Sequence, residues 1–201
     1  MPLDAHWNLV HATHGTADEL KAVSASGASI VICPSTEANL GDGIFDFSGY
    51  AGGTWAIGSD SHVTRNWTQE LRLLEYSQRL TQRRRNVAAH AARTESSATA
   101  LFQAALMGAN SATSQPLGAI KVGHRADFLV LDDQSPALLG VPLDYLLDAL
   151  VFSSPDARFA AVFVGGRRVF SAAGLAGGKP DHDLWPQLTQ GFVRTMQSLW
   201  S

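Results

Sequence analysis

Cysteine is nearly absent from this sequence of 201 residues, in which Cys33 is the only one. A single cysteine excludes an intramolecular disulfide framework and suits a reducing cytoplasm. Cys33 closes the apolar run Ser29–Cys33. A thiol in such a run is expected to be a small buried side chain rather than a nucleophile.

The chain also lacks an excess of positive charge and any long apolar segment. Its 15 Lys and Arg residues stand against 18 Asp and Glu residues, for a net charge of -3. This balance provides no general attraction to nucleic acid or to an anionic membrane. The one basic run, Arg83-Arg84-Arg85, is interpreted as a solvated helix end. No segment has the pattern of a signal peptide or the length of a membrane span, so we expect a soluble, cytoplasmic protein without nucleic-acid or membrane partners.

What the chain does contain is an alternation of short apolar runs with helical segments. The composition, 45% hydrophobic and 16% charged, is typical of a globular protein. Strands are predicted at Trp7–Val10, Ser29–Cys33 and Thr54–Gly58. Helices are predicted over about 16–27, with Thr16 or Asp18 as the cap, over 66–85, and over 97–110, where Gly108 is suited to close packing. The helix over 66–85 is expected to place Trp67, Leu71 and Leu74 on an apolar face and Arg72, Glu75 and Arg79 on a polar one. A polar loop is predicted over 34–43 and a short helical turn over 45–50. This order indicates an α/β fold with a parallel sheet covered by helices.

Polar and ionisable residues follow the predicted strands at one end. His11 and His14 follow the first strand, the 34–43 loop follows the second, and Asp60 and His62 follow the third. The carboxyl ends of parallel strands meet at one edge of a sheet, where α/β enzymes place their catalytic groups. The alternative for Asp60 is a helix N-cap or turn residue.

The second half of the chain is predicted to contain short strands joined by glycine turns, and a terminal helix. Two short strands around a Gly-His-Arg turn are predicted in 118–132, and a hairpin turning at Gly165-Gly166 is predicted in 159–170. The remaining predictions are a helix leading into a short strand over 143–152, a glycine-rich linker over 174–180 and an amphipathic helix over 184–200.

Five segments together resemble the amidohydrolase superfamily and, within it, the formimidoylglutamate deiminase family. They are His11-Ala-Thr-His14, the string Ser35–Gly43, Gly58-Ser-Asp60-Ser-His62, the run Glu70–Tyr76 and the run Val122–Asp132. The resemblance extends to about residue 170. It implies the C-terminal part of a (β/α)8 metal-dependent hydrolase barrel, with the three strands as the sixth, seventh and eighth, and the C-terminal share of a small β-sandwich. The expected domains are 1–117, a partial barrel, 118–175, a sandwich segment, and 176–201, a linker and helix.

The resemblance also implies roles for individual residues. His11 would polarise the substrate and the attacking water, and Asp60 would bind a divalent metal, usually zinc, and accept the proton of the water. His14 is expected to orient its loop. The expected substrate-binding residues are Ser35, Glu37, Asn39 and His62. Asp127, in the sandwich turn, is expected to make a structural hydrogen bond. The implied reaction hydrolyses the C=N bond of formimidoylglutamate and releases ammonia.

The chain departs from that family in what precedes His11. A complete enzyme carries a His-x-His pair, a further metal-binding histidine and a glutamate proton donor there, and this sequence contains no His-x-His. A full barrel takes roughly 250 residues. We therefore expect the isolated chain to be inactive unless a complementing N-terminal half supplies the rest, and to associate as a homo-oligomer or with that half. The alternatives are a related aminohydrolase of aminated heterocycles, a non-catalytic interaction module, and a small stand-alone α/β binding protein.

Overall fold

A computed structural model describes residues 2–88, 96–132, 134–154, 156–172 and 185–200. The predicted linker over 174–180 lies outside the described residues. Contacts within the chain define two compact units. The first contains Met1–Arg125 and Gln134–Ala157, and the second contains Ala126–Asp133 and Arg158–Ser201. The three domains expected above remain a prediction.

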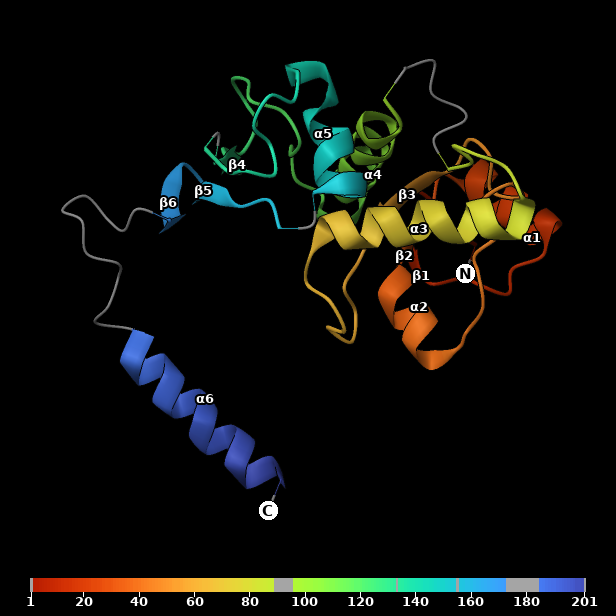
Figure 1. Ribbon diagram of the computed structural model, residues 1–201. Coiled ribbons are helices and arrows are strands. Elements are labelled where there is room, and N and C mark those ends of the chain that lie inside the picture. The colour runs from red at the N-terminus through yellow and green to blue at the C-terminus, as the bar shows by residue number, and fades with distance from the viewer. Residues whose placement is uncertain (1, 89–95, 133, 155, 173–184, 201) are drawn as a thin grey trace. The chain divides into compact units, whose positions relative to one another are not determined.

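The first unit contains the predicted parallel sheet. Its strands are β1 (Asn8–Val10), β2 (Ser29–Ile32) and β3 (Thr54–Ile57), in the order β1-β2-β3 (Figure 1). Both pairings are parallel, which confirms the mixed α/β content and the alternation predicted from the sequence. Because the strands run in one direction, the residues after Val10, Ile32 and Ile57 come to the same edge.

Helix α1 (Ala17–Ser26) connects β1 to β2. Its N-cap is Thr16 rather than the alternative Asp18, and Thr16 forms a capping box with Glu19 in which each residue accepts a hydrogen bond from the other's backbone N–H. The helix ends at Gly27, which adopts the left-handed conformation with φ 80°.

The polar loop predicted over 34–43 is wrong for its first seven residues, which form helix α2 (Pro34–Leu40). Pro34 occupies the first helical turn, where its missing N–H costs nothing, and Gly41 ends the helix with φ 74°. The free N–H of Ser35 donates to the carboxylate of Glu70, at 2.9 Å. The partner that stabilises the helix start thus comes from a distant segment.

Two long helices follow the sheet, α3 (Trp67–Gln82) and α4 (Ser97–Thr113). Asn66 and Ser96 cap their N-termini with their side chains. Both agree with the predicted helices to within three residues at each end. The predicted apolar face of α3 is confirmed at Leu71 and Leu74, which are buried.

Glu75 is the exception on α3, because the pattern placed it with Arg72 and Arg79 on the polar face and the structure buries it completely. Its carboxylate accepts hydrogen bonds from the backbone N–H groups of Val87 and Ala88 and from Nε of Arg79, at 2.7–2.9 Å. Three donors replace the water that a buried carboxylate loses.

The core of the first unit lies between the sheet and these helices, and α4 packs directly against β3. The buried residues that share this core include Leu20, Ile30, Ile32, Phe45, Leu71, Leu74 and Leu101. A Cβ at Gly108 of α4 would lie 1.9 Å from the carbonyl oxygen of Trp55 in β3. The predicted close packing at Gly108 is therefore confirmed.

The short strand predicted at the end of the segment 143–152 does not form, so that part of the prediction is wrong. The segment forms a 3-10 turn (Leu143–Tyr145), the short helix α5 (Leu146–Asp148) and a π-helical turn (Ala149–Ser153). Asp148 accepts a hydrogen bond from the backbone N–H of Ala98, at the start of α4, which gives this carboxylate a capping role.

The second unit is an antiparallel sheet of β4 (Phe128–Leu131), β5 (Phe159–Val164) and β6 (Arg167–Ser171), followed by helix α6 (Trp185–Trp200). The predicted hairpin is confirmed, since Gly165 and Gly166 both have positive φ. Asp127 accepts a hydrogen bond from the N–H of Gly165, at 2.6 Å, which is the structural role expected for it. Of the two strands predicted in 118–132, only β4 forms, because Gly118 and Gly123 turn the preceding chain through positive φ.

Among the described helices, none combines the length and apolar character needed to cross a bilayer.

Candidate functional site

The candidate site lies where the three parallel strands end. His11 directly follows β1 and continues its pairing, because its N–H donates to the carbonyl of Val31 at 2.9 Å. Four non-glycine residues near the strand ends have left-handed backbone conformations: His11 (φ 68°), Ala12 (φ 50°), Asp60 (φ 39°) and His62 (φ 60°). Such conformations cost energy and concentrate at functional sites, where the surrounding fold holds them in place.

His11 contacts two carboxylates through its two ring nitrogens. Nδ1 lies 3.2 Å from Glu37 Oε1, and Nε2 lies 3.7 Å from Asp60 Oδ2. The side chain of Glu37 is 5% exposed, whereas those of His11 and Asp60 are 34% and 42% exposed. Because a carboxylate can only accept, the hydrogen bond to Glu37 places a proton on Nδ1 and leaves the lone pair of a neutral ring on Nε2. A buried carboxylate thus orients an imidazole whose other nitrogen faces solvent and Asp60.

Three consecutive residues of helix α2 position the two carboxylates that contact His11, those of Glu37 and Asp60. Ser35 donates its N–H and its hydroxyl to the buried carboxylate of Glu70, at 2.9 and 2.6 Å. The hydroxyl of Thr36 donates to the carbonyl of Ser59, at 3.3 Å, and accepts from the N–H of Ser61, at 3.2 Å, so it ties the loop that carries Asp60.

Glu37 is the third of these residues of α2. Its Oε1 accepts a hydrogen bond from the N–H of Cys33 at 2.8 Å and lies against Nδ1 of His11. The start of α2 is thereby connected to the end of β1, to the loop after β3 and to α3.

Two buried carboxylates lie around the start of α2, next to the candidate site. Glu37 and Glu70 are 4% and 2% exposed, and no Lys or Arg forms an ion pair with either of them among the described residues. His11 is the basic group that faces Glu37. Burial raises the pKa of the Cys33 thiol to about 12, and the neighbouring charges of Glu37, Asp60 and Glu70 add to the shift. Cys33 is therefore a buried neutral thiol, as the sequence predicts.

This shift predicts a loss of stability at alkaline pH. The unfolded thiol ionises near pH 9 and the folded one near pH 12, so the unfolded state binds fewer protons between these values and the free energy of unfolding falls. Relative to Cys33→Ala, the wild-type chain is expected to lose about 1.4 kcal/mol per pH unit over that interval. Urea denaturation of both proteins at several pH values measures the free energy of unfolding. If it fell equally with pH in wild type and Cys33→Ala, the prediction would be contradicted.

The structure places the expected substrate-binding residues in different surroundings. Ser35 is buried and its hydroxyl is engaged by Glu70. Asn39 is exposed on α2, and His62 is exposed in the loop that carries Asp60. His14 is exposed, and its ring lies near Gly43, at the end of the predicted loop. Only Glu37 joins His11 and Asp60 in one cluster, and the substrate-binding roles remain predictions.

Sequence reasoning missed Thr36 and Glu70. The signal for Glu70 was its position, since it falls on the apolar stripe of α3 beside Leu71 and Leu74, where an unpaired carboxylate would be costly. Nothing in the sequence distinguishes Thr36 from a solvent-exposed threonine of a loop.

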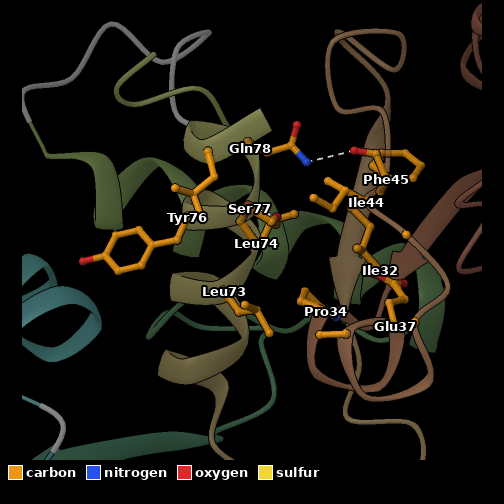
Figure 2. A pocket seen from close by; sticks show the side chains of 14 residues that line it. Ile32, Pro34, Glu37, Ile44, Phe45, Leu73, Leu74, Tyr76, Ser77 and Gln78 are labelled. Atoms are coloured by element: carbon orange, nitrogen blue, oxygen red, sulfur yellow. Dashed lines mark hydrogen bonds between the residues drawn. The ribbon is translucent and has the colours of Figure 1, made fainter. Parts of the chain in front are cut away.

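A cavity of about 390 Å³ lies between α2 and α3, and Glu37, which contacts His11, is among the residues that line it (Figure 2). Its walls are mostly apolar, with Pro34 of α2 facing Leu73 and Leu74 of α3. The side-chain amide of Gln78 donates to the carbonyl of Phe45 at 2.8 Å across one end. None of the described residues that line it carries a positive charge, so this cavity is not suited to a substrate with carboxylates.

Comparison with known proteins gives a consistent result. The sequence pattern of the amidohydrolase family matches residues 3–169. A formimidoylglutamate deiminase of Pseudomonas aeruginosa is 46% identical over 169 residues, which are 83% of this chain and 37% of that protein. This chain therefore spans little more than a third of that relative's length.

Solved structures agree. The crystal structure of an amidohydrolase from Brucella melitensis is 37% identical and has a TM-score of 0.85, covering 100% of this chain and 43% of that one. An adenosine deaminase from Xanthomonas campestris with bound zinc is 22% identical with a TM-score of 0.71, covering 96% of this chain and 44% of that one, which shows a shared fold.

Proposed function

Since the chain belongs to the amidohydrolase family, we propose that it forms part of the active site of a metal-dependent deaminase that hydrolyses the C=N bond of formimidoylglutamate. On this proposal β1, β2 and β3 correspond to the sixth, seventh and eighth strands of a (β/α)8 barrel. The 46% identity to a formimidoylglutamate deiminase supports the substrate. The second unit would be the C-terminal share of the β-sandwich.

One observation carries the proposal, the convergence of His11 and Asp60 from separate strand ends. Their side chains approach to 3.7 Å with Glu37 behind the imidazole. A structural turn residue would need no oriented imidazole beside it. The left-handed backbone at both residues, a conformation that costs energy in non-glycine residues, supports the proposal.

The donors present fit a divalent metal ion as part of its ligand set. Asp60 offers an exposed carboxylate oxygen beside the Nε2 lone pair of an imidazole, and zinc is held in proteins by such oxygen and nitrogen donors. We infer that Asp60 is the ligand from this chain. The other ligands would come from the part of the relatives that this chain does not match. A bound divalent ion would lower the pKa of water and polarise the C=N bond.

The roles of the two residues follow from their protonation. Asp60 Oδ2, as a carboxylate, accepts the proton of the attacking water and delivers it to the nitrogen that leaves as ammonia. His11 Nε2, kept free of a proton by the Nδ1 contact with Glu37, accepts a hydrogen bond from that water and orients it. Water adds to the formimidoyl carbon, and the proton left on the resulting hydroxyl passes by way of Asp60 to the same terminal nitrogen. The bond between the carbon and that nitrogen then breaks, so formylglutamate and ammonia are the products.

The proposal predicts activity only when the missing strands are supplied. The purified 201-residue chain is assayed for ammonia release from formimidoylglutamate, alone and mixed with the preceding part of the Pseudomonas aeruginosa relative. We expect no turnover by the chain alone. In the mixture we expect turnover, with about one metal ion per pair more than the chain alone binds. Activity of the chain alone would contradict the need for complementation.

The same assay tests the alternatives. A mixture that deaminates aminated heterocycles and leaves formimidoylglutamate unchanged would assign the related aminohydrolase activity instead. A mixture that associates and neither binds metal nor turns over either substrate would indicate a non-catalytic module. Elemental analysis of the same samples reports metal content independently of substrate.

A further inference from the structure

The two nitrogens of the His11 imidazole face opposite environments. Nε2 faces Asp60 and belongs to the proposed active site. Nδ1 faces Glu37, on the side of the ring toward the start of α2. There, one donor atom from each of His11, Cys33 and Glu37 lies within 4.8 Å of the other two. Of this second cluster, Cys33 takes no part in the hydrolysis proposed above, and Glu37 takes part only by orienting the ring of His11.

The cluster has the dimensions of a zinc site. With the bond lengths of zinc to sulfur, nitrogen and oxygen, the ligand atoms of a tetrahedral site lie roughly 3.3–3.8 Å apart. His11 Nδ1 and Glu37 Oε1 are 3.2 Å apart, and a separation of up to 4.8 Å closes with a shift of about 1 Å. Cys33 is the N-cap of α2, and its backbone N–H donates to Glu37 Oε1 at 2.8 Å, which holds the Glu37 carboxylate beside Cys33.

The charge of the surroundings favours a cation. Cys33, Glu37 and Glu70 are each at most 4% exposed, and the described parts of the chain bring no Lys or Arg into an ion pair with the two carboxylates. Buried negative charge is costly unless a positive charge accompanies it. A donor set of thiolate, imidazole and carboxylate selects zinc or cadmium over magnesium or calcium.

We propose that His11, Cys33 and Glu37 form a second binding site for a soft divalent cation, zinc or cadmium, distinct from the ion that Asp60 would hold. Three protein ligands leave the fourth position of a tetrahedral ion to water. On binding, the thiol proton of Cys33 passes to solvent and the imidazole proton moves from Nδ1 to Nε2. Nε2 then donates toward Asp60 instead of accepting from water, so the ion inhibits. The inhibition rests on the proposed function, whereas the binding does not.

Cadmium provides a direct test on the 201-residue chain, because a cadmium–thiolate bond absorbs in the ultraviolet and Cys33 is the only thiol. Titration with cadmium is expected to produce this band at one ion per chain. Cys33→Ser removes the band. His11→Gln and Glu37→Gln each weaken cadmium affinity by at least about tenfold.

Asp60→Asn separates this site from the proposed catalytic one. The variant is expected to keep cadmium affinity within about twofold, because Asp60 faces the other nitrogen of the ring. Thermal melts confirm that each variant folds, and His11→Gln, at a partly exposed position, remains informative where the buried Glu37→Gln unfolds. Absence of the band, a band insensitive to His11→Gln, or loss of the band in Asp60→Asn overturns the proposal, whether or not the mixture deaminates formimidoylglutamate.

Discussion

Replacing Asp60 with asparagine is expected to lower kcat/KM for formimidoylglutamate by at least about a thousandfold in the complemented protein. Asparagine keeps the shape of the side chain and cannot accept the proton of the attacking water, and positioned proton transfer contributes about a hundredfold to ten-thousandfold. Loss of a proposed metal ligand adds to the effect. The fold is expected to be unchanged, because the Asp60 side chain is 42% exposed. Steady-state ammonia release and elemental analysis measure the two effects.

Asp42→Asn is the matched control, since it makes the same chemical change just beyond the end of α2. Its backbone N–H, which donates to the carbonyl of Glu37, is retained. We expect its activity to stay within about twofold of wild type, as for surface substitutions away from a site. Equal losses in the two variants, or full activity of Asp60→Asn, would remove Asp60 from the proposed mechanism.

Gly108→Ala is expected to be the most destabilising single-methyl change in the first unit. The added Cβ would meet the carbonyl oxygen of Trp55 at 1.9 Å and the nitrogen of Ala56 at 2.7 Å, both of which are backbone atoms of β3. Overpacking costs about 1–3 kcal/mol, and a clash with rigid backbone belongs at the upper end. A melting temperature lower by about 10 °C is expected for a chain of this size.

Gly191→Ala provides the comparison, because Gly191 is also inside a helix, and no atom of the described residues outside the backbone of that helix lies within 4 Å of the position of its Cβ. Alanine favours a helix over glycine by about 1 kcal/mol, so this variant is expected to be as stable as wild type or slightly more stable. Similar melting temperatures for Gly108→Ala and wild type would mean that α4 does not approach β3 as closely as described. Because β3 leads to Asp60, Gly108→Ala is also expected to reduce activity of the complemented protein.

The strands and their polar ends could be predicted because their signals are local. β2 and β3 are short, largely buried apolar runs of a parallel sheet, whereas Val10 of β1 is 52% exposed. Each strand ends where the polarity changes abruptly. The Thr16 cap and the Gly165-Gly166 turn are equally local, since each depends on residues within a few positions.

The features that were not predicted depend on residues far apart in the sequence. Helix α2 could not be predicted because the carboxylate that stabilises its start, Glu70, lies 35 residues later in the sequence. The burial of Glu75 depends on Val87 and Ala88, which reach it from 12 and 13 residues away. The pairing of His11 with Glu37 spans 26 residues. Tertiary hydrogen bonds leave no periodic pattern in the sequence. The polar residues at the strand ends could therefore be predicted, whereas the hydrogen bonds that orient their side chains could not.

Helix α2 also couples the positions of the two proposed catalytic side chains, His11 and Asp60. Thr36 restrains the loop of Asp60 and Glu37 restrains the ring of His11, and the two are neighbours on a single rigid turn. A displacement of this turn moves both restraints together, so the acid–base pair gains or loses its alignment as one unit. Combined substitutions at Ser35, Thr36 and Glu37 should therefore cost less free energy than the sum of the single substitutions. Any one of them already releases the turn of α2 that restrains His11 and the loop of Asp60.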